Sequence, residues 1–162
     1  MKTKILGFLF LILITSCKKS SDLVLDTNLS SCPINSTCTY NFNDNSNFSG
    51  SNQIVAGSDR VFTYQSINTN LCDLTTQFFF KIPMGSTQFT IDSAQIVNGQ
   101  VSSYFNICAC CDLIANLNPI GGVIKGKSID GSRWLINAKV IIGTSSNQPL
   151  DTLVVNQYFT KK

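Results

Sequence analysis

Three cysteines fall within four residues, at Cys108, Cys110 and Cys111, and they carry the densest reactive chemistry in the chain. Cys108 and Cys111 have C-x-x-C spacing, in which a thiolate of lowered pKa at a helix start supports redox exchange. Thiolates this close together also suit copper(I) or zinc. The cluster therefore raises a thiol-redox or a copper/zinc-binding function as one interpretation.

Structural disulfides are the favoured interpretation of the same residues. Three more cysteines offer one partner for each member of the cluster: Cys32, Cys38 and Cys72. An even number of cysteines is typical of disulfide frameworks in exported proteins. Bridges between immediate neighbours inside the cluster would be strained, so we expect the cluster to pair outward with the other three. Titration of free thiols separates this interpretation from the redox or metal alternative.

The chain contains no histidine, and its nine acidic residues are all aspartates. Without histidine, Ser-His-Asp and Cys-His nucleophile systems and histidine zinc sites are excluded. Two aspartates could still do acid–base work on a sugar, but the sequence brings no two of them together. Turns are the ordinary place for exposed aspartates. We therefore expect no catalytic residue, no metal and no cofactor, with an aspartate-pair enzyme as the third hypothesis.

Residues Gly121–Ser128 match the nucleotide-binding pattern G-x-x-x-x-G-K-[ST] letter for letter. Such a loop works between a strand and a helix whose amino end faces the phosphates. Here Asn118-Pro119 precedes the match, and Asp130-Gly131, a favoured hairpin turn, follows it. The segment itself alternates as a strand does. We therefore expect a strand at this position and no nucleotide ligand.

The charge balance argues against nucleic acid as a partner. The chain has 12 basic and 9 acidic residues, a formal net charge of +3. Lys2 and Lys4 lie in the amino-terminal leader, ahead of its apolar run, and the other basic residues are scattered along the sequence. Proteins that bind nucleic acid gather their basic residues on one face or along one helix.

The amino terminus has the form of an export signal. A basic head, Met1–Lys4, precedes the apolar run Ile5–Ile14, and a Thr-Ser-Cys junction ends at Cys17. Ten residues of helix rise only about 15 Å, half of a bilayer core of roughly 30 Å, so the run is too short to span a membrane. The pattern predicts a signal peptide over residues 1–16.

Ile14-Thr15-Ser16-Cys17 resembles the lipobox of bacterial lipoproteins. The Ser-Cys-Lys-Lys junction before an Asn/Ser/Thr-rich chain is similar to the envelope lipoproteins of Bacteroidetes-type bacteria. The resemblance covers residues 1 to about 19 and implies that Cys17 carries a diacylglycerol and an acylated amine. Two or more acyl chains hold a protein firmly at a membrane. The implied location is the cell envelope, with the outer membrane favoured and either of its faces open.

The rest of the chain divides into a tether and one domain. Residues 18–31 are polar and short of aromatic side chains, so we expect residues 17–31 to form a lipidated tether. Residues 32–162 suit a single domain by length.

Patterns of period two predict a chain of short strands. They cover residues 40–42, 61–67, 76–82, 88–91, 95–97, 101–107, 123–129, 133–142 and 153–159. In the clearest of them, one face carries Trp134, Ile136, Ala138, Val140 and Ile142. We expect Trp134 and the phenylalanines at 78–80 to dominate the core. A helix is expected only over 112–117, before Pro119.

Many short strands without a long helix favour an all-β fold. We expect an antiparallel β-sandwich, Ig-like or similar, braced by disulfides. The sequence then predicts a lipid-anchored envelope protein with a non-enzymatic binding or structural role. Its expected partners are the membrane, through the lipid, and a protein or glycan ligand held by the loops at 43–58 and 108–121.

Overall fold

The computed structural model describes residues 23–49, 53–99, 101–108, 110 and 116–162. The expected leader at 1–16, the lipid site Cys17 and positions 112–115 of the expected helix lie outside these residues. No helix within the described ranges has the length and apolarity to cross a membrane.

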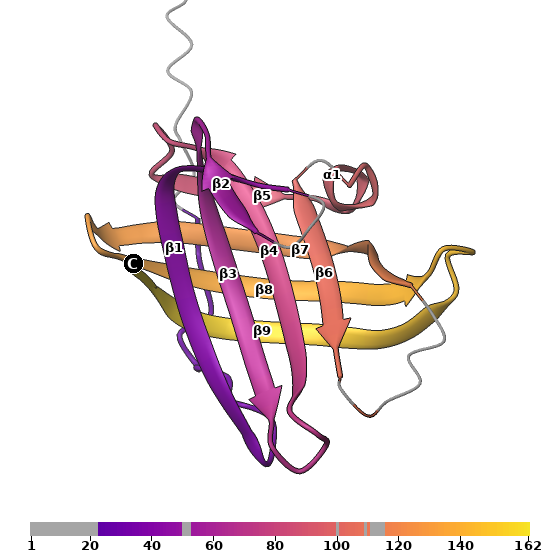
Figure 1. Cartoon of the computed structure of the whole chain (residues 1–162). Coiled ribbons are helices and arrows are strands. Elements are labelled where there is room, and N and C mark those ends of the chain that lie inside the picture. The colour runs from indigo at the N-terminus through magenta and orange to yellow at the C-terminus, as the bar shows by residue number, and fades with distance from the viewer. Residues whose placement is uncertain (1–22, 50–52, 100, 109, 111–115) are drawn as a thin grey trace, which may run out of the picture.

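The described residues are nearly all β, as expected (Figure 1). They form nine strands and one short helix: β1 (Ser36–Phe48), β2 (Ile54–Ala56), β3 (Asp59–Asn68), β4 (Leu74–Pro83), β5 (Gln88–Ile91), α1 (Ser93–Val97), β6 (Ser102–Ile107), β7 (Leu117–Asp130), β8 (Arg133–Thr144) and β9 (Pro149–Lys161).

All nine strands belong to one sheet, in the order β5-β7-β8-β9-β1-β3-β4-β6, with β2 added beside β1. Neighbours pair antiparallel except β1 and β9, which run parallel at Asn41–Thr160 and Phe42–Lys161. The sheet is therefore mixed and continuous, which differs from the expected antiparallel, Ig-like sandwich. The reason is geometric: the β8–β9 hairpin fixes the direction of β9 before its last residues meet β1.

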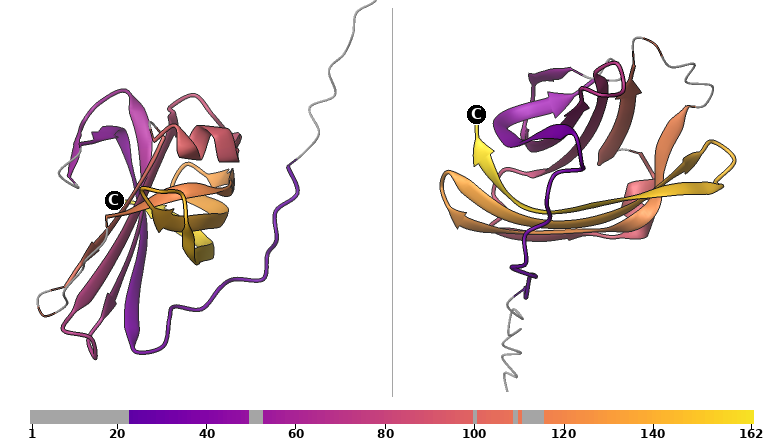
Figure 2. Two further views of the ribbon diagram at one scale, coloured as in Figure 1. Left: turned by 90° about the vertical axis from the view of Figure 1, so that its right-hand side faces the viewer. Right: turned by 90° about the horizontal axis from the view of Figure 1, so that it is seen from below.

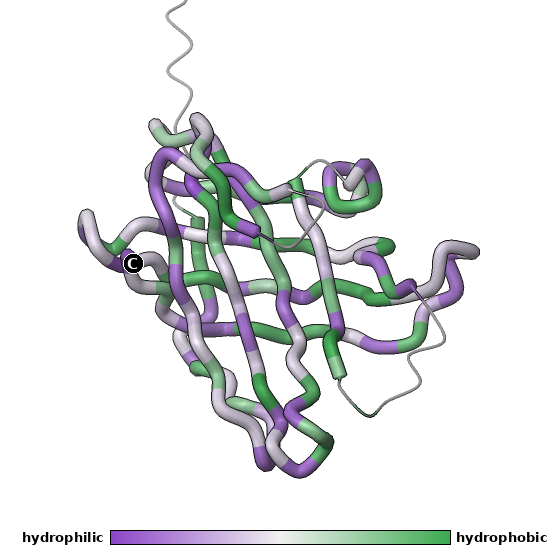
Figure 3. The backbone as a smooth tube through the Cα atoms, viewed as in Figure 1, coloured by the Kyte–Doolittle hydropathy of each residue, from purple (hydrophilic) through white to green (hydrophobic). Residues whose placement is uncertain are grey.

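The sheet curls so that its two halves face each other. β1, β3, β4 and β6 form one layer, and β7, β8 and β9 run across it on the far side (Figures 1 and 2). Hydrophobic and hydrophilic residues alternate along the strands (Figure 3). Because successive side chains point to opposite faces of a strand, each layer has one apolar face, and this face forms the core. The largest fully buried side chains include Trp134, Phe42, Phe62, Phe78, Phe80 and Phe159.

Phe62 joins the two layers at the centre of the core. Its ring stacks on Phe80 at 4.8 Å between centroids and meets the edge of Trp134 at 5.5 Å. Aromatic pairs of this kind contribute about 0.5–1.5 kcal/mol beyond their burial. The expected core role of Trp134 is confirmed, whereas Phe79, between two inward-facing phenylalanines, lies on the outer face of β4.

The segment 95–97, expected as a strand, is the end of helix α1. The carboxylate of Asp92 accepts a hydrogen bond from Gln95 N at 2.9 Å, and Gln95 Oε1 accepts one from Asp92 N at 3.0 Å. This reciprocal capping box satisfies two backbone donors at the helix start. Ile96 is fully buried and holds the helix against the core. The strand prediction was wrong because local capping and a single apolar anchor outweigh a three-residue pattern.

Residues 43–58, expected as an exposed loop, contain the end of β1 and all of β2. Phe48 of β1 pairs with Ile54 of β2. β1 bends after Asn43, where its register with β3 shifts and Asn45 takes a φ of 50°. The bend carries the β1–β2 hairpin over the outer face of β3 and β4, and the Phe48 ring lies 6.2 Å from that of Phe79.

The expected tether contacts the sheet over the residues that the structure describes. Residues 23–31 lie across the outer face of β8 and β9 (Figure 2). Asp26 N donates to Asn137 Oδ1 at 2.7 Å, and Ser30 N donates to Asn156 O at 2.8 Å. At its other end, Leu23 N donates to the side chain of Gln88 on β5 at 3.4 Å.

Candidate binding site

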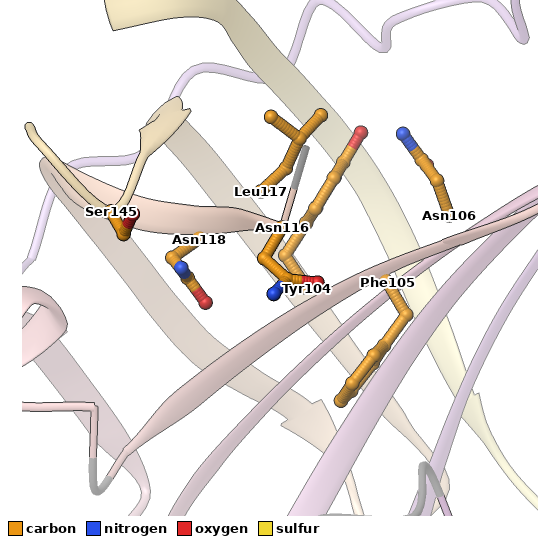
Figure 4. A pocket seen from close by; sticks show the side chains of 7 residues that line it. All are labelled: Tyr104, Phe105, Asn106, Asn116, Leu117, Asn118 and Ser145. Atoms are coloured by element: carbon orange, nitrogen blue, oxygen red, sulfur yellow. The ribbon is translucent and has the colours of Figure 1, made fainter. Parts of the chain in front are cut away.

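A hollow of about 420 Å³ lies between β6 and the beginning of β7 (Figure 4). Its lining comes from three segments: Tyr104, Phe105 and Asn106 of β6, Asn116, Leu117 and Asn118 at the start of β7, and Ser145 after β8. Small-molecule sites typically measure about 300–1,000 Å³. The hollow is therefore large enough for a ligand.

Strand alternation determines which β6 side chains enter the hollow. Tyr104 and Asn106 extend to one side of the strand and Phe105 to the other (Figure 4). Tyr104 belongs to the buried core, and Leu117 packs against that core from β7. The hollow therefore begins where the apolar interior between the two layers ends.

The free edge of β6 supplies backbone hydrogen-bonding groups beside the hollow. β6 is the last strand of the sheet and, in the described chain, pairs only with β4. Lys81 N donates to Val101 O at 3.0 Å, so the odd-numbered residues of β6 direct their backbone groups toward β4. The backbone N–H and C=O groups of Ser102, Tyr104 and Asn106 consequently point away from β4.

The described lining of the hollow is uncharged. Among the residues that the structure describes, no lysine, arginine or aspartate lines it, and the lining combines three amides, two hydroxyls and two apolar side chains. Burial raises the pKa of Tyr104, so its phenol keeps its proton and can both donate and accept. Thr76 Oγ1 donates to Asn106 Oδ1 at 2.9 Å and orients that amide.

A disulfide links the segment after β6 to the β3–β4 turn. Cys72 and Cys110 are bonded, with their Cα atoms 6.0 Å apart, in agreement with outward pairing of the cluster. Cys108 is also disulfide-bonded, and its Sγ lies 3.7 Å from Leu71 O in the same turn. The Cys72–Cys110 bond and the contact of Cys108 with Leu71 O hold the segment after β6 against the turn.

The expectation that every cluster cysteine pairs outward is wrong for Cys32 and Cys38, and therefore also for Cys108, whose disulfide partner is none of the three outside cysteines. Cys32 and Cys38 are bonded to each other, with Cα atoms 5.8 Å apart. A turn before β1 brings them together: Asn35 has a φ of 59°, and Ser36 N donates to Pro33 O at 3.1 Å. A sequence separation of 6 is enough for a disulfide because the chain reverses direction between the two cysteines.

The cluster cysteines that the structure describes are in disulfides and are not free thiols. Cys111 lies outside the described residues, and Cys108 and Cys110 are in disulfides. A disulfide sulfur is not a thiolate and cannot act as a nucleophile or a strong metal ligand. Within the described ranges, no three histidine, cysteine or acidic residues are grouped to hold a metal.

The segment Gly121–Ser128, which matches the nucleotide-binding pattern, lies inside β7 and pairs with β8, as its alternation predicts.

Some of the aspartates considered for acid–base catalysis form ion pairs. The pairs are Asp44–Arg60 at 2.5 Å, Asp59–Lys81 at 3.4 Å and Asp130–Arg133 at 2.9 Å.

Sequence reasoning located part of the hollow. Asn116 and Asn118 fall within the expected ligand segment 108–121, although Asn118 lies in strand β7 instead of a loop. Tyr104 and Asn106 carry no sequence signal beyond strand alternation, since only the curl of the sheet brings them near β7.

The fold and the hollow define a nearly all-β protein of one mixed, curled sheet with an uncharged site at its open edge. No protein-family model matches the sequence, and no curated protein or solved structure matches it significantly.

Proposed function

We propose that the protein is a lipid-anchored module of the cell envelope that binds a neutral, hydroxyl-rich ligand, a glycan, in the hollow between β6 and β7. The observation that supports this assignment is the described part of the lining, where amides and hydroxyls surround an apolar patch and every described side chain is neutral.

A sugar matches this lining in two ways. Its hydroxyls both donate and accept, as do the amides of Asn106, Asn116 and Asn118. The C–H face of its ring suits the apolar surface of Leu117 and the Tyr104 ring. An anionic ligand would find no cation in the lining, and a wholly apolar ligand would leave buried amides without partners at about 1–3 kcal/mol each.

The anchor rests on the leader and on the Cys17 junction. Lys18 and Lys19, next to the lipid site, would add attraction to anionic headgroups. Five residues, 18–22, separate the lipid site Cys17 from the contact of Leu23 with β5, so the chain advances six positions between them. At no more than about 3.5 Å per residue, the β5 end of the domain then stays within about 20 Å of the membrane surface.

Metabolic labelling tests the anchor. The protein is produced in a bacterial host fed an alkyne-tagged fatty acid, and intact mass spectrometry follows. We expect label on the wild-type chain and none on Cys17→Ala. Equal labelling of both chains, or an uncleaved leader on the wild type, would refute the anchor.

Calorimetry tests the ligand class. The mature lipidated protein in detergent is titrated with four neutral hexasaccharides of gluco-, manno-, galacto- and xylo-configuration. Asn118→Ala should weaken binding by about tenfold, because one hydrogen bond is lost. Gln53→Ala, which removes an exposed amide on the β1–β2 hairpin, should bind as the wild type does. If Asn118→Ala has no effect on any probe that binds, the hollow is not the site.

A further inference from the structure

A second cavity, of about 270 Å³, lies on the outer face of β1, β3 and β4, away from the core and from the hollow. Its polar lining comes from Thr39, Asn41, Asn43, Thr63, Gln65 and Gln77. All six side chains are neutral hydrogen-bonding groups.

The register of the strands arranges these groups in rows. Thr39 lies opposite Gln65, and Gln65 lies opposite Gln77, so one row crosses three strands. Asn41 lies opposite Thr63 in the next row. Neighbouring strands are about 4.8 Å apart, so hydrogen-bonding groups recur at that spacing across the cavity floor.

Two polar atoms of this cavity lack a partner. Asn43 Oδ1 and Thr63 Oγ1 are both buried, and neither has a hydrogen-bond partner among the described residues. A buried polar atom left in this way destabilises the folded protein, whereas rotation of its side chain toward a ligand hydroxyl in the cavity would give it a partner. The two atoms come from β1 and β3, the strands that form the middle of the floor.

The β1–β2 hairpin covers the cavity from above, and contacts elsewhere hold it in place. Ile54 of β2 belongs to the lining. Lys81 Nζ donates to Asn47 Oδ1 at 3.0 Å and lies 5.6 Å from the ring centroid of Phe48. Phe48 in turn packs against Phe79, whose ring forms the apolar part of the floor. The enclosure is therefore built before a ligand arrives, which reduces the cost of binding.

We propose that this cavity is a second binding site and that it takes one sugar residue of a neutral glycan. Asn43 Oδ1 and Thr63 Oγ1 are buried in the empty protein, so rotation of these two side chains toward the cavity brings their oxygens to the ring hydroxyls of the ligand. Among the described lining residues, the exposed Lys162 is the one charged side chain, so the cavity does not favour a strongly charged ligand. Its volume is about nine times that of a single water, enough for one hexose unit. The assignment is independent of the hollow between β6 and β7.

Thr63→Val tests the proposal because it removes the hydroxyl and keeps the shape. The mature protein is titrated with the same four hexasaccharides, and its thermal midpoint is measured without ligand. We expect binding to weaken about tenfold at one site while the midpoint stays the same or rises, since the hydroxyl has no partner in the empty protein. Thr90→Val, an exposed position on β5, should change neither quantity.

The outcomes separate the two sites. A loss with Thr63→Val and none with Asn118→Ala supports the outer cavity alone, and the reverse result overturns it while leaving the hollow in place. A lowered thermal midpoint for Thr63→Val also overturns the proposal, because the hydroxyl would then serve the fold. Failure of all four probes to bind overturns the sugar assignment.

Discussion

Asp44, at the bend of β1, is the aspartate whose removal we expect to cost the most stability. Its Oδ1 accepts a hydrogen bond from Arg60 Nε at 2.5 Å, and its Oδ2 lies 2.8 Å from Lys161 Nζ. The guanidinium carbon of Arg60 lies 5.0 Å from the Phe42 ring and 5.1 Å from the Trp134 ring. The side chains of Arg60 and Asp44 are only 12% and 13% exposed, so the pair is largely removed from water.

Asp44→Asn leaves that guanidinium without its carboxylate between two aromatic rings. Breaking a buried ion pair costs about 3–5 kcal/mol. The cost is smaller here because the pair keeps some exposure to water and because an asparagine oxygen still accepts a hydrogen bond from Arg60. We therefore expect the free energy of unfolding to fall by about 2–3 kcal/mol. Urea unfolding followed by the fluorescence of Trp134, the single tryptophan, measures it. Asp73→Asn, the same change at an exposed turn, is the matched control and should cost less than 0.5 kcal/mol, within the usual range for surface positions.

The same pair makes a pH prediction. The hydrogen bond from Arg60 holds the pKa of Asp44 below its ordinary value of 3.8, outweighing the opposite effect of burial. A carboxyl with a lowered folded pKa contributes its full stability above the unfolded value, and loses it as the pH falls through the folded value. The difference between wild type and Asp44→Asn should therefore be constant from pH 7 to about pH 5 and shrink toward pH 3. A difference that persists unchanged at pH 3, or a cost below 0.5 kcal/mol at pH 7, would refute the argument.

Three further predictions concern the cross-links and β7. Replacing Cys72 and Cys110 with serines should lower the free energy of unfolding by about 4 kcal/mol, and replacing Cys32 and Cys38 should lower it by about 2 kcal/mol. The difference is expected because the sequence separations are 38 and 6. Equal losses in urea titrations would contradict this loop-entropy account. The unreduced mature protein should titrate with fewer than one free thiol per chain, whereas two or more would support the redox or metal alternative. The Gly122→Ala protein should unfold without a cooperative thermal transition, because residue 122 has a φ of 120° and an added Cβ would clash with the backbone of β8. A melting curve like that of the wild type, followed by circular dichroism, would contradict this close approach.

Long, regular patterns predicted the core because burial on one face imposes a period of two over many residues. Trp134, Ile136 and Val140 are buried as their alternation requires. Short segments did not behave in this way, and residues 95–97 became helical once Asp92 capped them. The parallel contact of β1 with β9 could not be predicted, since it joins residues more than a hundred positions apart through the curl of the whole sheet.

The candidate sites were harder to predict than the fold for the same reason. Asn118 and Tyr104 meet across a seam that no local pattern encodes. Asn43 and Thr63 look like ordinary polar positions of a half-exposed strand, and nothing in the local sequence shows that their side-chain oxygens are buried without a partner beside a cavity.

The Asp44–Arg60 pair connects stability with the outer cavity. Asn43 and Asp44 are consecutive on β1, so their side chains leave the strand on opposite faces: Asn43 faces the cavity, and Asp44 faces Arg60. The bend between Asn43 and Ser46 starts at this point and positions the hairpin that covers the cavity. Loss of the ion pair should therefore weaken saccharide binding at the outer cavity more than at the hollow between β6 and β7, which lies at the β6 edge of the sheet and is not covered by the β1–β2 hairpin. Equal weakening at both sites would mean that Asp44 supports the fold as a whole rather than the position of the hairpin.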